Sequence, residues 1–114
     1  MNRKLMYLRY LPFLVLLASC STFTATKTPQ GVIDEANIMI IAAANQIGEY
    51  MANGILTAQE AQSELDKVKK ARADIKDAQK LLDDGSAILA RNKAELTQRL
   101  LLELQKKLAA RNRT

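Results

Sequence analysis

Apolar positions gather on one side of a helix in three long segments of the chain, and in the first two they recur every three or four residues, the spacing of one face of an α-helix. In the second segment the mean spacing is 3.5 residues, which is typical of coiled coils. In the third segment the leucines fall within one broad sector of a helix. The three series are Ile33, Ala36, Ile40, Ala43, Ile47 and Tyr50; Ala61, Leu65, Val68, Ala71, Ile75, Ala78 and Leu82; and Leu89, Leu96, Leu100, Leu101, Leu104 and Leu108.

Capping and turn residues set the ends of these helices. Thr28 before Pro29 is typical of a helix start, and Gly54 is typical of a helix end. Thr57 and Glu60 have the spacing of a capping box, which indicates a second start. The sequence therefore predicts helices over about 29–53, 57–84 and 86–110, with the last turn at 83–86.

Three helices joined by short connections must each run antiparallel to the next. The predicted fold class is therefore all-α, an antiparallel three-helix bundle over residues 31–114. The alternative is a long, coiled-coil-like helical hairpin that buries its apolar stripes only on dimerisation.

Residues 38–44 are apolar on every side of the predicted first helix. At seven residues the segment is too short to span a bilayer. We expect it to form the buried centre of the bundle, because a helix that is apolar all round needs more than one neighbour. Two alternatives stay open: an oligomer or partner interface formed by Ile38, Met39 and Ile41, or a membrane-active patch.

A basic head and a short apolar run open the chain, and this arrangement is typical of a secretory signal peptide. The head contains Arg3, Lys4 and Arg9, and the apolar run covers 11–17. The stretch that follows, Leu17-Ala18-Ser19-Cys20, resembles the lipobox of bacterial lipoproteins.

That resemblance implies cleavage between Ser19 and Cys20, an S-diacylglyceryl group on the Cys20 sulfur and acylation of the new amine. Residues 1–19 would then be the signal peptide, and residues 20–30 a lipidated cysteine followed by a Thr-rich tether. Ser21 resembles the residue found at this position in lipoproteins directed to the outer membrane. The expected location is the bacterial cell envelope, anchored by lipid, at the outer membrane and facing the periplasm.

The charge of the mature chain is small. The full sequence has 17 Lys and Arg, 12 Asp and Glu and a net charge of +5, but three of the basic residues belong to the signal. Removing them leaves +2, so we expect no nucleic-acid partner. The chain has no His and one Cys, and general acid–base catalysis most often uses His. We therefore predict no enzyme, no catalytic residue, no cofactor and no metal.

Charge is divided unevenly between the predicted helices, because the first has three acids and no base and the third is basic. Opposite charges suit packing of these two helices. Alternatively, Lys106, Lys107, Arg111 and Arg113 contact an anionic envelope surface, or they only keep the domain soluble.

The function predicted from these features is that of a small helical interaction or structural module. The membrane is contacted through the lipid on Cys20, and helical faces bind a protein partner or a second copy. The alternative is a membrane-active or lysis-associated lipoprotein, encoded by a prophage or plasmid.

Overall fold

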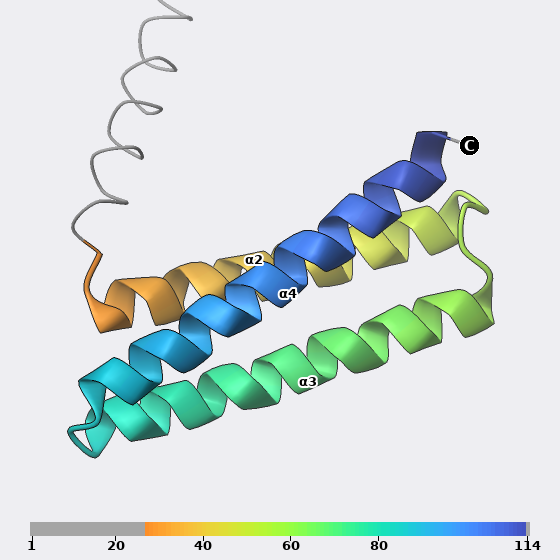
Figure 1. Ribbon diagram of the computed structural model, residues 1–114. Coiled ribbons are helices and arrows are strands. Elements are labelled where there is room, and N and C mark those ends of the chain that lie inside the picture. Colours follow the sequence, from red (N-terminus) through yellow and green to blue (C-terminus); the bar gives the residue numbers. More distant parts are fainter. Residues whose placement is uncertain (1–26, 114) are drawn as a thin grey trace, which may run out of the picture.

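The computed structural model describes residues 27–113, which form three helices, α2 (Pro29–Ala52), α3 (Ala58–Asp83) and α4 (Ala87–Arg113). α3 runs opposite to α2 and α4, and each helix packs against the other two (Figure 1). No strand occurs within residues 27–113. The predicted all-α, antiparallel three-helix bundle is therefore confirmed.

The predicted lipobox, the cleavage site at Ser19 and Cys20, and residues 20–26 of the tether lie outside the described residues. The last two residues assigned to the tether, Pro29 and Gln30, belong instead to the first turn of α2.

The predicted helix starts are capped by threonines. The Thr28 hydroxyl accepts a hydrogen bond from the Gly31 backbone N–H at 3.1 Å, and Pro29 is the first helical residue. Thr57 and Glu60 form the predicted capping box. The Thr57 hydroxyl accepts from the Glu60 N–H at 3.1 Å, and the Thr57 N–H donates to the Glu60 carboxylate at 3.0 Å.

Glycines with positive φ end the first two helices, Gly54 at 76° and Gly85 at 92°. A residue with a side chain rarely adopts this conformation, so these positions favour glycine. Each turn contains the six-residue hydrogen bond of a Schellman motif, from Ile55 N–H to Tyr50 and from Ser86 N–H to Leu81, both at 2.8 Å. α2 and α3 thus end within one residue of prediction, whereas α4 extends three residues beyond it.

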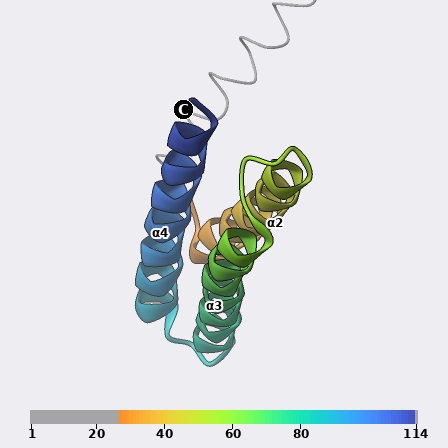
Figure 2. The same ribbon diagram turned by 90° about the vertical axis from the view of Figure 1, so that its right-hand side faces the viewer.

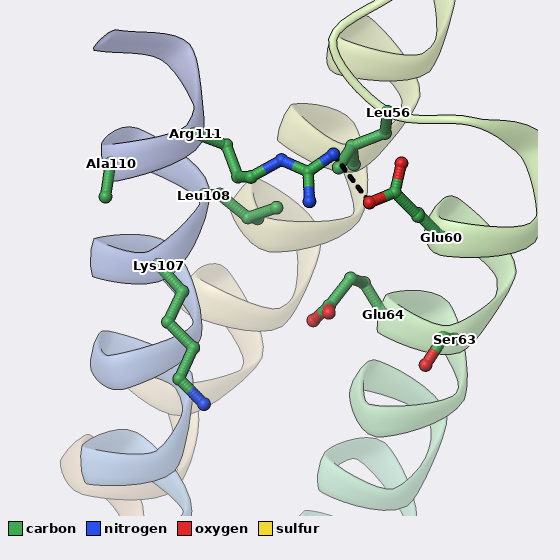
Figure 3. A pocket seen from close by; sticks show the side chains of 8 residues that line it. All are labelled: Leu56, Glu60, Ser63, Glu64, Lys107, Leu108, Ala110 and Arg111. Atoms are coloured by element: carbon green, nitrogen blue, oxygen red, sulfur yellow. Dashed lines mark ion pairs between the residues drawn. The ribbon is translucent and has the colours of Figure 1, made fainter. Parts of the chain in front are cut away.

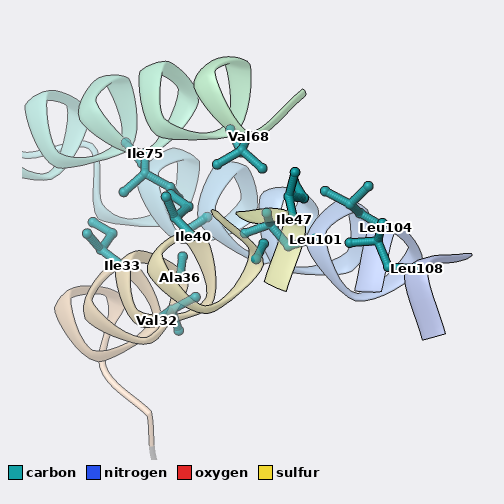
Figure 4. Packing of buried hydrophobic residues seen from close by; sticks show 14 of the residues in the cluster. Val32, Ile33, Ala36, Ile40, Ile47, Val68, Ile75, Leu101, Leu104 and Leu108 are labelled. Carbon is teal, nitrogen blue, oxygen red and sulfur yellow. The ribbon is translucent and has the colours of Figure 1, made fainter. Parts of the chain in front are cut away.

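The core lies between one stripe on each helix (Figure 4). Ile33, Ile40 and Ile47 of α2 are at most 2% exposed. The predicted stripes of the first two helices are confirmed, with Tyr50, Leu65 and Leu82 only partly buried. The core residues are Val32, Ile33, Ala36, Ile40, Ala43, Ile47, Leu56, Ala61, Val68, Ala71, Ile75, Ala78, Ala94, Leu101, Leu104 and Leu108.

The predicted core sector of the third helix is wrong along its first half. Leu89, Leu96 and Leu100 are more than half exposed, and Ala90, Ala94 and Thr97 are buried instead. These small side chains let the helices approach closely where leucines would not fit. The buried Thr97 hydroxyl donates to the Lys93 carbonyl at 2.9 Å, so its burial leaves no unsatisfied group.

Polar side chains form hydrogen bonds between the helices around this core. The Gln98 amide of α4 donates to the Val32 carbonyl of α2 at 2.8 Å. Gln30 of α2 and Gln79 of α3 exchange two hydrogen bonds, at 2.8 and 3.0 Å. The start of α2 is therefore held to both neighbours.

Neighbouring isoleucines of α2 should differ sharply in their effect on stability. Ile40→Ala should lower the free energy of unfolding by about 2–5 kcal/mol, because it removes a buried side chain. Ile41→Ala should change it by about 0.5 kcal/mol or less, because Ile41 is 57% exposed. Chemical denaturation of residues 21–114 measures both values. Equal losses for the two variants would contradict the assignment of the buried face.

Candidate interaction faces on α2 and α4

The apolar segment 38–44 has one buried side and one exposed side. Ile40 and Ala43 are buried, whereas Ile38 is 67% and Ile41 57% exposed. The expectation that the whole segment lies inside the bundle is therefore wrong for this chain. The reason is geometric, because α3 and α4 contact each other and so cover the same side of α2. The turned view shows α2 at one edge of the bundle, with no described helix beyond it (Figure 2).

The predicted interface residues divide in the same way. Ile38 and Ile41 are exposed, but Met39 is half-buried and packs against the core. The structure therefore places two of the three predicted interface residues on one free face and assigns the third to folding.

This face continues along the whole of α2. Starting from Asp34, exposed residues follow at steps of 4, 3, 4, 3 and 4. Steps of this kind repeat every 3.5 residues on average, which is the spacing of a coiled-coil seam. The apolar stripe predicted from the sequence is the one that contains Ile40. The second series contains Ile38, and the prediction did not include it although the same spacing rule gives it. We call this set the outer seam of α2: Asp34, Ile38, Ile41, Asn45, Gly48 and Ala52.

Gly48 lies within α2, four residues before the helix ends at Ala52, and no contact in the described residues accounts for a glycine there. A glycine in a helix interior is about 1 kcal/mol less favourable than alanine. A Cβ atom built at Gly48 meets nothing within 4 Å, so no intramolecular contact requires the missing side chain. At Gly54, by contrast, the positive φ explains the glycine.

The charge on the outer seam of α2 is acidic. α2 contains Asp34, Glu35 and Glu49 and no Lys or Arg. Glu35 forms an ion pair with Lys27. Within residues 27–113 no ion pair to Asp34 or Glu49 is present, and Asp34 accepts a hydrogen bond from the Gln30 amide at 2.9 Å.

The leucines that α4 leaves exposed form a second face with the same steps. Leu89, Leu96 and Leu100 are 59%, 55% and 52% exposed. With the charged residues between them they follow at steps of 4, 3, 4, 3 and 4, as on α2. We call this set the outer seam of α4: Leu89, Lys93, Leu96, Leu100, Glu103 and Lys107.

A groove of about 260 Å³ opens beside the outer seam of α4, between α4 and α3. Leucines of α4 and Ala71 form its apolar part, and three lysines and two acids from both helices surround it. The lining residues are Lys67, Lys70, Ala71, Asp74, Leu100, Leu101, Glu103, Leu104 and Lys107. An apolar side chain with an acidic neighbour fits this lining better than a purely polar ligand does.

A larger open groove of about 490 Å³ lies between the start of α3 and the end of α4 (Figure 3). An ion pair between Arg111 and Glu60 crosses it. Ser63 and Lys107 stand on opposite walls, and no hydrogen bond joins them. The groove therefore joins two helix ends without assembling a serine–lysine pair. It is lined by Leu56, Glu60, Ser63, Glu64, Lys107, Leu108, Ala110 and Arg111.

The four basic residues predicted to contact an anionic surface do not act as one group. Lys106 and Lys107 are exposed, but as consecutive helical residues they point about 100° apart. Arg111 pairs with Glu60 and donates to the Ile55 carbonyl at 3.4 Å. The side chain of Arg113 lies outside the described residues.

Within residues 27–113 no cluster of three or more His, Cys, Asp or Glu side chains has the arrangement of a metal site. In the same range no helix combines the length and the apolar character that crossing a bilayer demands. Comparison of the chain with known protein families, curated proteins and solved structures finds no match. The two outer seams are therefore the features on which a functional proposal rests.

The Glu60 carboxylate should stabilise the fold in a pH-dependent manner. The Thr57 backbone N–H, and after it Arg111, lower the pKa of Glu60 below its ordinary value of 4.5. A lowered pKa means that the stabilisation is present above the ordinary value and is lost as pH falls through the lower, folded-state value. Glu60→Gln should therefore reduce stability more at neutral pH than well below pH 4.5. Denaturant titrations at both pH values measure this; an equal effect at both would contradict it.

Proposed function

We propose that the protein is a lipid-anchored component of the bacterial cell envelope whose helical domain acts as a small interaction module. Its sequence supports the anchor through the lipobox-like stretch ending at Cys20. The expected site of action is the periplasmic face of the outer membrane. Two or more acyl chains on one cysteine give stable membrane attachment, whereas one chain gives only marginal binding.

The observation that carries the proposed interaction is the exposure of Ile38 and Ile41 on α2. The opposite face of the same helix supplies Ile33, Ile40 and Ile47 to the core, so α2 is already held in place without the exposed pair. Two large aliphatic side chains one turn apart therefore contribute little to the fold. Their arrangement fits the helix-to-helix recognition that interaction modules use.

The membrane-active alternative has less support from the same face. Helices that lie in a membrane interface usually carry Lys and Arg beside their apolar face, and these residues bind anionic lipids. The outer seam of α2 has Asp34 within it and Glu49 beside it, and the helix has no basic residue. A protein surface with basic residues suits this face better than an anionic membrane does.

Cys20→Ala should abolish incorporation of labelled fatty acid and leave the precursor uncleaved, because the sulfur is the proposed site of attachment. Radiolabelled palmitate followed by gel electrophoresis measures both effects. Ser21→Ala is the matched control and should keep the label. Undiminished labelling of the Cys20→Ala chain would remove the proposed anchor.

A photo-reactive amino acid at position 38 should capture a protein in intact cells, because Ile38 lies on the proposed interface. The same residue at position 73 is the matched control, since Ala73 is exposed on α3 outside both seams. Gel electrophoresis should show a discrete heavier species from position 38 and none from position 73. The absence of any such species from position 38 would refute the interaction module.

A further inference from the structure

The two outer seams of this chain complement each other in spacing. Each follows steps of 4, 3, 4, 3 and 4 along its own helix, and each is exposed for most of its length. Two helices with the same 3.5-residue repeat can keep their seams in contact along their whole length. Within residues 27–113 the outer seam of α2 has no helix beside it, whereas that of α4 borders α3 through the Lys93–Asp77 ion pair and the groove. The leucines of the outer seam of α4 are more than half exposed, so they can still receive a helix from outside.

Their charges are complementary as well. The outer seam of α2 has Asp34 within it and Glu49 beside it, while that of α4 has Lys93 and Lys107 with one acid, Glu103, and is basic on balance. Lys107 forms no ion pair among the described residues, and Lys93 makes only an exposed one to Asp77, at 3.5 Å. Pairing α2 with another α2 would bring acids together, whereas pairing it with α4 brings acids to amines.

If the two helices run antiparallel, one register pairs the residues of the outer seam of α2 with those of the outer seam of α4. If Ile41 lies opposite Leu100, then Asp34 lies opposite Lys107, and Ala52 lies opposite Leu89. The same register sets Ile38 opposite Glu103 and Asn45 opposite Leu96. Gly48 then lies opposite Lys93 and leaves room for the long lysine side chain, whose amine reaches the neighbouring Glu49. The glycine that has no role inside the chain thus gains one between chains.

We infer that the occupant of the outer seam of α2 is the outer seam of α4 of a second copy of this chain. This inference rests on the proposed interaction module and names its partner. The contact joins two different surfaces, so it is head-to-tail, and repetition gives rings or chains of molecules. Ile38 and Ile41 then cover the apolar part of the groove between α3 and α4 of the neighbouring copy.

Disulfide trapping tests the contact directly. Cys20 is the only cysteine of the chain, so a full-length protein with Cys20→Ser and one new cysteine has a single thiol. We expect a mixture of Ile41→Cys and Leu100→Cys chains to form a covalent dimer on mild oxidation. A disulfide requires Cα atoms within about 7 Å, and positions 41 and 100 face each other in the proposed alignment.

Four controls keep the result interpretable. Each single variant oxidised alone should stay monomeric, and Ala73→Cys mixed with Ile41→Cys should give only background dimer. Asp34→Lys in the Ile41→Cys chain should reduce the yield, and Lys107→Glu in the Leu100→Cys chain should restore it. Circular dichroism should show that every variant keeps its helices.

The contrary outcomes separate the two proposals. Dimers formed by Ile41→Cys alone would mean that α2 pairs with α2, which overturns the inference. A mixed yield no higher than the Ala73→Cys control would overturn the second copy as occupant. If position 38 still captures a heavier species whose mass is not a multiple of this chain, the interaction module stands with a different partner. If it captures nothing, both proposals fail.

Discussion

The burial of one side of α2 against α3 and α4 holds this structure together. Ile33, Ile40 and Ile47 are almost completely removed from water, and they contact stripes from both other helices. A bundle of this length has a small core and few aromatic residues, so its stability depends on such aliphatic contacts. The same arrangement leaves the other side of α2 without a neighbour in the chain. The fold therefore creates the face on which the proposed function depends.

Helix ends were predictable from sequence because local chemistry determines them. The bonds made by Thr28, Thr57 and Glu60 involve residues three positions apart, and the positive φ of Gly54 and Gly85 is a local property. Which of residues 38–44 are buried and which are exposed was not predictable in the same way. A helix that is apolar all round does not reveal how many neighbours it has, and here both neighbours lie on one side.

The leucines of α4 show a second limit of sequence reasoning. The spacing of the leucines predicts that these larger side chains form the core. In the structure Ala90, Ala94 and Thr97 are buried, and Leu89, Leu96 and Leu100 are exposed. Close approach of helices selects small residues, and this depends on the partner helix. The first and third helices do pack against each other, but within residues 27–113 no ion pair joins α2 to α4. Within the described residues apolar stripes make that contact, and Asp34 of the outer seam of α2 and the neighbouring Glu49 form no ion pair.

The central claim is that α2 folds through one face and associates with a second copy of the chain through the other. Isoleucine methyl resonances of residues 21–114 test it most directly, because the two faces carry different isoleucines. On dilution, the account predicts that the methyl shifts of Ile38 and Ile41 change while those of Ile33, Ile40 and Ile47 stay constant. Methyl shifts that are independent of concentration on both faces, or that change equally on both, would contradict it.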